Sequence, residues 1–155
     1  DQEAFNQAKL NTNNLSNVNI FNSNSQEFLN DFQLNKQEIL DKKILFWLDA
    51  HGYGFEWPLK FEVDFITENF SDVFILIDDF KVPHLDVFKY DSYDNQICSF
   101  DYIKDSINWT KYNLYYPNYE EKTSKHHPLK GWGLLTKNND MKFPKEIQRF
   151  IKQTI

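Results

Sequence analysis

The sequence predicts an α/β fold with three layers, in which helices cover both faces of a mostly parallel β-sheet. Two observations predict it. Helical and strand-like patterns alternate along the 155 residues, and two short segments, 44–48 and 73–77, are apolar at every position. A strand that is covered on both faces has this composition, as in a parallel sheet. The length suits one domain, so we expect residues 1–155 to form a single domain.

The N-terminal third of the chain predicts two helices with a short strand between them. Residues 2–13 have a helical pattern, and residues 18–21 are a short strand candidate. Ser23 and Gln26 have the spacing of a capping box, in which each side chain binds a free backbone N–H at the start of a helix. The helix that follows has an apolar stripe made of Phe28, Leu29 and Phe32.

The middle of the chain predicts two strands joined by a helix. Residues 44–48 form the first apolar strand, and Pro58 stands where a helix can begin, because proline lacks only an N–H that is unbonded at that position. An apolar stripe with helical spacing then runs through Leu59, Val63, Ile66 and Phe70. Residues 73–77 form the second apolar strand, so this stretch predicts a strand–helix–strand unit.

The C-terminal part predicts one helix, a pair of antiparallel strands and a last helix. Phe100, Ile103 and Ile107 share one helical face. Residues 112–116 and 132–136 are the two arms of the terminal antiparallel pair. Pro144 opens the last predicted helix, whose apolar residues are Ile147, Phe150 and Ile151.

The composition excludes several classes of function. The net charge is −6, without a segment dense in Lys or Arg, which disfavours a nucleic-acid partner because binding to phosphates needs a positive surface. No apolar run approaches the roughly 20 residues that span a bilayer. Cys98 is the only cysteine, and residues 1–17 do not resemble a signal peptide. We therefore expect a cytoplasmic protein that acts on a small molecule or a carbohydrate.

Acidic residues follow both apolar strands. Asp49 and His51 come after the first strand, and Asp78 and Asp79 come after the second. In open α/β sheets, ligands bind at the carboxyl ends of the strands. Three carboxylates at that edge would repel one another, and Mg²⁺, which prefers oxygen ligands, would relieve the repulsion. A single Asp at a strand end more often caps the next turn, but three of them with His51 favour a functional site.

The other candidate residues have ordinary explanations. His84, His126 and His127 fit solvated loops, and Cys98 fits a small buried position. Four tyrosines can line a substrate pocket, although packing in the core or at a sheet edge explains them equally well. They are Tyr112, Tyr115, Tyr116 and Tyr119.

Four segments together resemble the Rossmann-like S-adenosylmethionine-dependent methyltransferases, and most closely the metal-dependent O-methyltransferases such as catechol O-methyltransferase. Residues 1–8 are similar to the helix after the second strand of that family, and residues 18–26 to the third strand and the turn that contacts adenine. Residues 46–51 resemble the fourth strand with the first metal carboxylate. Residues 76–79 resemble the fifth strand, where the family has Asp followed by Asn or Asp.

The resemblance implies roles for six residues. Asp49, Asp78 and Asp79 would be ligands of Mg²⁺, with Asp49 also taking part in catalysis. Ser25 and Gln26 would contact the adenine of S-adenosylmethionine. His51 stands near the general base of the family, where catechol O-methyltransferase has a lysine, and an imidazole can accept a proton near neutral pH. The implied reaction is methyl transfer to a hydroxyl oxygen of a small molecule or a sugar.

The chain departs from the family at its front. No Gly-x-Gly-x-x-Gly motif occurs, so the first strand and the glycine-rich cofactor loop would have to precede Asp1, and we expect a truncated form of a longer domain. An unpaired sheet edge would favour a homodimer. Two alternatives stay open: a metal-dependent glycosyltransferase that uses Asp78 and Asp79 to hold a metal–diphosphate, and a non-catalytic fragment that acts as an interaction module.

Overall fold

A computed structural model describes residues 1–35, 39, 42–51, 56–118, 129–138, 143–145 and 151–154. The fold is α/β, with one sheet of strand order β1-β2-β6-β5-β7 and a small separate hairpin. The strands of the sheet are β1 (Lys43–Leu48), β2 (Asp72–Asp78), β5 (Tyr112–Pro117), β6 (Trp132–Lys137) and β7 (Ile151–Thr154), and the hairpin consists of β3 (Ser92–Tyr93) and β4 (Gln96–Ile97). The helices are α1 (Gln2–Thr12), α2 (Ser25–Asn35), α3 (Leu59–Asn69), α4 (Phe100–Ile103) and the 3₁₀ turn η2 (Lys104–Ser106).

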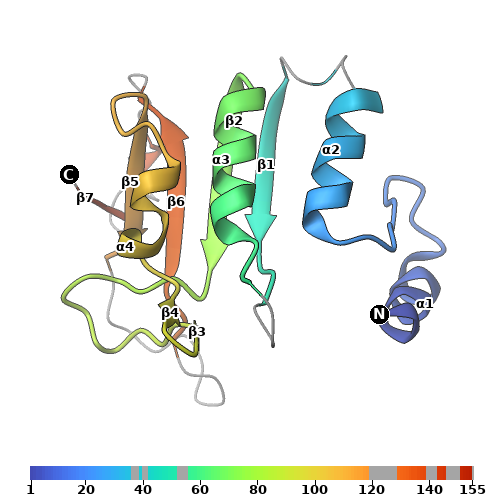
Figure 1. The fold of residues 1–155 in the computed structure, drawn as a ribbon, viewed down its shortest axis with the longest axis horizontal. Coiled ribbons are helices and arrows are strands. Elements are labelled where there is room, and N and C mark those ends of the chain that lie inside the picture. Colours follow the sequence, from blue (N-terminus) through green and yellow to red (C-terminus); the bar gives the residue numbers. More distant parts are fainter. Residues whose placement is uncertain are drawn as a thin grey trace.

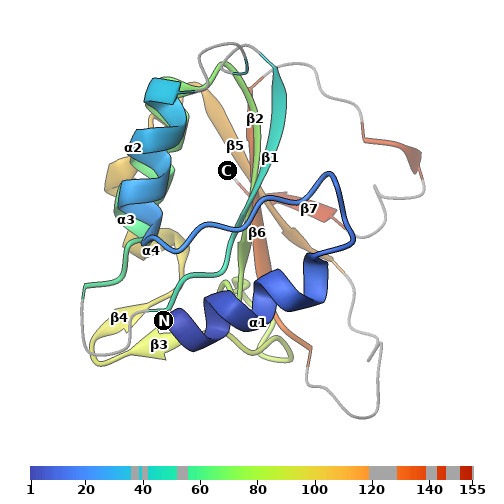
Figure 2. The ribbon, with the colours of Figure 1, turned by 90° about the vertical axis from the view of Figure 1, so that its right-hand side faces the viewer.

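The helices that pack on the sheet, α2, α3 and α4, all lie on one side of it. Figure 2 shows α2, α3 and α4 together on one face, while α1 lies beyond the β1 edge (Figure 1). The expected third layer is therefore wrong for the described residues. Exposure along β1 alternates, because Leu45 and Trp47 point to the open face and are 63% and 65% exposed. The uniform apolar sequence of β1 does not indicate that both faces are covered.

The pairing of the strands confirms two predictions and corrects a third. β1 and β2 are parallel neighbours, as their sequences indicate. The predicted pair at 112–116 and 132–136 is also present, as antiparallel β5 and β6. However, β6 is inserted between β2 and β5 and is antiparallel to both, and β7 is antiparallel to β5. The sheet is therefore mixed, and the expectation of a mostly parallel sheet is wrong.

The core lies between α3 and β2. The predicted apolar stripe of α3 is almost completely buried, at 2% exposure or less, and it packs with equally buried side chains of β2. Burial of one such aliphatic side chain contributes roughly 1.5–3 kcal/mol to stability. These contacts fix the crossover from β1 to β2, and they involve Leu59, Val63, Ile66 and Phe70 of the helix with Val73, Ile75 and Ile77 of the strand.

Three local predictions are corrected by the structure. Residues 18–21 form a loop rather than a strand, since no neighbouring strand supplies hydrogen bonds there. The helix that follows is capped by Asn24, whose Oδ1 accepts the backbone N–H of Glu27 at 2.9 Å, and not by the Ser23–Gln26 pair. Ile151 begins strand β7 instead of extending a helix from Pro144. The predicted residues 147 and 150 lie outside the described residues.

The remaining helical predictions are close to the structure. The helix at residues 2–13 is α1, which begins at an N-cap provided by Asp1. Pro58 is the N-cap residue of α3, so the helix begins at Leu59, one position after the predicted start. The helix predicted around Phe100 is a single α-helical turn continued by η2. Among the described residues, none of the helices is long and apolar enough to cross a membrane.

Candidate functional site

The carboxyl ends of β1 and β2 place the predicted acidic residues next to each other. Leu48 pairs with Ile77 in the parallel register, so Asp49 and Asp78 follow at adjacent positions, and neighbouring strands lie about 4.8 Å apart. Asp49, His51, Asp78 and Asp79 all line one small cavity of about 10 Å³. The four predicted side chains therefore lie together, and we call this cluster the acidic site.

Asp91, directly before β3, and Tyr93, within β3, complete the acidic site. His51 Nδ1 lies 3.2 Å from Asp91 Oδ2 and 2.7 Å from the Tyr93 hydroxyl, which itself donates to Asp91 Oδ2 at 2.9 Å. Because the single hydroxyl hydrogen of Tyr93 goes to Asp91, Nδ1–H of His51 is the donor toward this pair. The neutral ring then has its acceptor lone pair on Nε2, as a general base requires.

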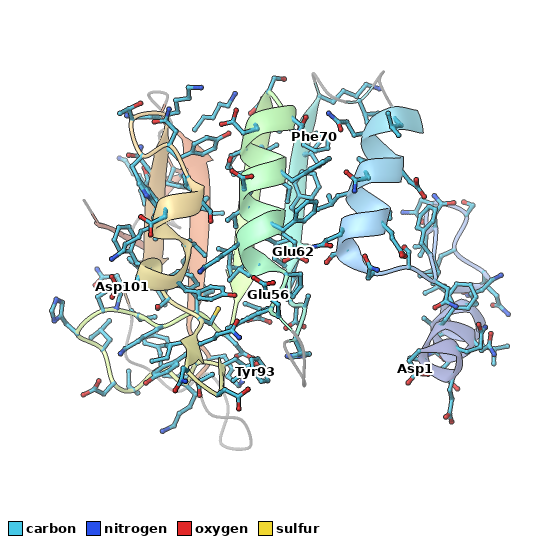
Figure 3. All side chains as sticks on the ribbon, in the orientation of Figure 1. Asp1, Glu56, Glu62, Phe70, Tyr93 and Asp101 are labelled. Atoms are coloured by element: carbon cyan, nitrogen blue, oxygen red, sulfur yellow. The ribbon has the colours of Figure 1, made fainter. Side chains whose placement is uncertain are left out.

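The hairpin brings Asp91 and Tyr93 to the carboxyl ends of β1 and β2. Figure 1 shows the hairpin of β3 and β4 at the end toward which β1 and β2 point, and Figure 3 labels Tyr93 there. Asp91 is held by its backbone, since its N–H donates to Asp79 O at 2.9 Å and its carbonyl accepts from Cys98 N at 2.9 Å. Trp57 packs edge-on against Tyr93, with ring centroids 5.2 Å apart. The position of the histidine is thus fixed by a loop 40 residues away in sequence.

Lys130 supplies the positive charge of the acidic site. Its Nζ lies 2.6 Å from Asp79 Oδ1 and 3.8 Å from Asp91 Oδ1. The hydrogen bond to Asp79, together with the charges of Asp79 and Asp91, raises the pKa of Lys130, although partial burial opposes this. Lys130 therefore stays charged at neutral pH and balances two of the carboxylates.

Gly131 lets this lysine come close to β2. A Cβ at position 131 would lie 2.0 Å from the carbonyl oxygen of Phe80, a distance that no side chain can accept. The same close approach allows Phe80 N to donate to Gly131 O at 3.0 Å. Asp79, directly before Phe80, has a positive φ of 49°, which Asp tolerates better than most residues. The main chain thus turns Asp79 toward Lys130.

Burial raises the pKa of two other carboxyl groups in the cavity wall. Burial raises the pKa of Asp49, and the neighbouring charge of Asp78 raises it further. Burial also raises the pKa of Glu62, partly offset by a hydrogen bond from the Ser25 side chain. Glu62 is only 2% exposed, and its Oε2 has no hydrogen-bond partner among the described residues. Figure 3 shows Glu62 on α3, on the side that faces α2.

Sequence reasoning missed Glu62, Asp91, Tyr93 and Lys130. A signal exists for Glu62, because it lies three residues after Leu59 and one before Val63, on the apolar face of α3. An acidic residue on a buried helical face needs a reason. The other three come from loops and strand ends whose spatial position depends on the tertiary fold, so no local pattern identifies them.

The predicted cofactor contacts Ser25 and Gln26 are at the start of α2. Ser25 reaches Glu62 and so lies beside the acidic site, whereas Gln26 is exposed. Cys98 is buried, as predicted, and burial raises the pKa of its thiol. His84 is exposed, while His126 and His127 lie outside the described residues.

The expected Mg²⁺ centre is not preformed. Among the residues that the structure describes, no group of three His, Cys, Asp or Glu side chains is arranged to hold a metal ion. Two contacts explain this: Asp79 pairs with Lys130, and Asp78 Oδ1 accepts the backbone N–H of Asp79 at 3.0 Å. Asp49, Asp78 and Asp79 share one cavity without converging on one point, so their described arrangement does not fit a Mg²⁺ ion.

Comparisons with protein-family models, with curated proteins and with solved structures find no match to this chain.

Proposed function

We propose that this chain carries the acceptor-activating part of an S-adenosylmethionine-dependent methyltransferase that acts on a hydroxyl oxygen of a small molecule or a sugar. The observation that carries the proposal is the His51–Asp91–Tyr93 hydrogen-bond network at the carboxyl ends of two parallel strands, beside Asp49 and Asp78. That end of an open α/β sheet is where ligands bind.

The order of the strands supports the same family. β1 and β2, which resemble the fourth and fifth strands of the family, are parallel neighbours, and the predicted terminal antiparallel pair is present as β5 and β6. Because one architecture hosts many activities, this agreement supports a fold relationship and leaves the activity to the site.

The charges of the acidic site suit a positively charged methyl donor. S-adenosylmethionine, when bound, supplies a methyl group on a cationic sulfur. Asp49 and Asp78 would face that charge, and Ser25 stands at the neighbouring helix start. The chain has no Gly-x-Gly-x-x-Gly motif, so its residues account for only part of a cofactor site. We therefore expect the isolated chain to bind the cofactor weakly.

His51 performs the proton transfer in this proposal. Its Nε2 accepts the proton of the substrate hydroxyl as the oxygen takes the methyl group. Asp91 accepts a hydrogen bond from Nδ1–H and stabilises the imidazolium that forms, and Tyr93 keeps Asp91 in place. Such positioned general-base catalysis contributes typically 10²–10⁴-fold to a rate.

Transfer of a labelled methyl group from S-adenosylmethionine to a panel of phenolic and sugar hydroxyl compounds tests this function. His51→Gln should lower the rate at least 100-fold, because glutamine cannot accept the proton. His84→Gln, at an exposed loop position, is the matched control and should retain the wild-type rate. Equal rates for both variants, or no transfer by the wild type to any acceptor, would contradict the proposal.

A metal-dependent glycosyltransferase fits these residues less well. That reading needs Asp78 and Asp79 to hold a metal–diphosphate, but the carboxylate of Asp79 already pairs with Lys130. A cation at this position would have to displace the lysine.

A further inference from the structure

A large cavity lies on the helix-covered side of the sheet, over β5. Its volume is about 820 Å³, which falls within the range of roughly 300–1,000 Å³ that is usual for small-molecule sites. The walls come from β5, from α4 and Trp109 beyond it, and from the hairpin with its strand β4. We call it the aromatic cavity, because its lining includes the rings of Phe100, Tyr102, Trp109, Tyr112 and Tyr116.

The rings of the aromatic cavity form a buried floor and an accessible wall. Tyr112 and Tyr116 are only 3% and 2% exposed, so they support the cavity from β5. Phe100 is 39% exposed and contacts Trp109, with ring centroids 5.0 Å apart. Trp109 donates to Lys104 O at 2.6 Å, a bond that holds its ring in place. A bound molecule can therefore reach a fixed aromatic surface, which favours a ligand with a flat apolar body.

The charged side chains that line the aromatic cavity do not balance one another. Asp101, which Figure 3 labels on α4, pairs with Lys104, whose Nζ lies 3.2 Å from its Oδ1. Lys81 is exposed and has no carboxylate partner among the residues that the structure describes. Its Nζ lies 5.2 Å from the centroid of the Tyr90 ring, a contact that does not neutralise the charge. The lining thus carries one uncompensated positive charge.

A neutral donor lies on the same side of the cavity as Lys81. The backbone N–H of Lys81 donates to Cys98 O at 2.7 Å, which places Lys81 beside the end of β4. Asn95 stands in the exposed turn between β3 and β4 and also lines the cavity. An ammonium group and an amide N–H₂ are both hydrogen-bond donors. A carboxylate suits such a pair, because hydrogen bonds to an ionised acceptor are roughly twice as strong as those between neutral groups.

We propose that the aromatic cavity binds a small organic anion, in which a flat apolar body ends in a carboxylate, with Lys81 as its charged partner. The apolar body lies against the rings of Phe100 and Trp109, and the carboxylate accepts hydrogen bonds from Lys81 and Asn95. The aromatic cavity shares no lining residue with the acidic site. This inference therefore does not depend on methyl transfer, since it concerns binding at a separate place in the fold.

The experiment compares two probes of nearly the same shape, 2-naphthoate and 2-naphthamide, of which only the first carries a negative charge. Fluorescence titration of the full chain at neutral pH, without S-adenosylmethionine, should show that the wild type binds both and prefers 2-naphthoate by roughly five- to tenfold, as expected for one partly exposed ion pair. Lys81→Met removes the ammonium group and keeps an unbranched side chain. It should reduce this preference to about onefold while 2-naphthamide binding stays unchanged.

Two further variants keep the test decisive. Lys42→Met makes the same change at an exposed position directly before β1, which β2 and β6 separate from β5, and should behave as the wild type. Phe100→Ala removes the accessible ring and should weaken both probes by roughly fivefold or more without changing the preference between them. Circular dichroism establishes that each variant is folded.

The proposal is overturned if the folded wild type binds neither probe up to its solubility limit, if it binds both equally well, or if Lys81→Met keeps the preference for 2-naphthoate. Because the titration contains no methyl donor, these outcomes leave the proposed methyl transfer untouched. A failed methyl-transfer assay would equally leave the binding result intact.

Discussion

Glu62 shows how a single residue connects the core to the acidic site. Its carboxyl group is buried on α3, accepts a hydrogen bond from Ser25, and lines the same cavity as Asp49. Burial favours the neutral form, so the pKa of Glu62 is higher in the folded chain than in the unfolded chain. Its protonation is therefore linked to stability.

The sign of that linkage gives a prediction. Between the unfolded pKa, near 4.5, and the higher folded pKa, the folded state binds the extra proton, so the free energy of unfolding falls as pH rises through this window. Glu62→Gln cannot ionise, so its free energy of unfolding should not fall with rising pH. At pH 8 the free energy of unfolding should be about 1–3 kcal/mol higher in Glu62→Gln than in the wild type. Urea titrations from pH 4 to pH 8 measure it.

Glu68→Gln is the matched control for this experiment. It makes the same change at an exposed position of the same helix and should leave the pH profile within about 0.5 kcal/mol of the wild type. A profile for Glu62→Gln that overlies the wild type at every pH would show that the carboxyl group is hydrated in solution.

At the scale of helices and strands, the sequence is most informative where one element has one dominant partner. The stripe of α3 packs on β2, so its spacing predicts both the helix and its buried face. The strand at 18–21 is wrong because a short apolar run becomes a strand only beside another strand, and none of the described strands pairs with it. Local pattern therefore predicts amphipathic helices better than isolated short strands.

The start of α2 distinguishes two capping assignments. Asn24→Ala removes the acceptor of the Glu27 N–H and should cost about 1 kcal/mol of unfolding free energy. Ser23→Ala, at the capping position predicted from the sequence, should change stability by less than about 0.3 kcal/mol. Chemical denaturation measures both variants, and a larger loss for Ser23→Ala than for Asn24→Ala would support the Ser23–Gln26 capping box instead.

At the scale of the whole molecule, the described helices leave one face of the sheet uncovered at β1, which the sequence did not indicate. Leu45 and Trp47 have the apolar character of core residues, but hydrophobicity identifies residues that can be buried without showing what covers them. The acidic residues after β1 and β2 were predictable for a different reason. A pair of parallel strands brings its two carboxyl ends to the same edge of the sheet. Asp91 and Lys130 were not, because their positions depend on where the hairpin and β6 pack.

This face should affect the oligomeric state. Within the described sheet, β1 pairs only with β2, so its outer edge is unpaired beside the exposed Leu45 and Trp47. We expect a homodimer through this edge, with a mass in light scattering of twice the 18.7 kDa chain. The double variant Leu45→Lys/Trp47→Lys should be monomeric, whereas Leu34→Lys, at an exposed site on α2, should remain dimeric. A monomeric wild type at 100 μM would contradict this expectation.

Saturation-transfer NMR measures directly, even at weak affinity, whether the acidic site binds the cationic methyl donor. Asp78→Asn and Asp72→Asn make the same change at opposite ends of β2, and Asp72 pairs with Lys43 far from the acidic site. We predict saturation transfer to S-adenosylmethionine in the wild type and in Asp72→Asn, its loss in Asp78→Asn, and none to UDP-glucose. Saturation transfer to UDP-glucose instead, or no saturation transfer to S-adenosylmethionine in the folded wild type, would show that the acidic site does not bind the methyl donor.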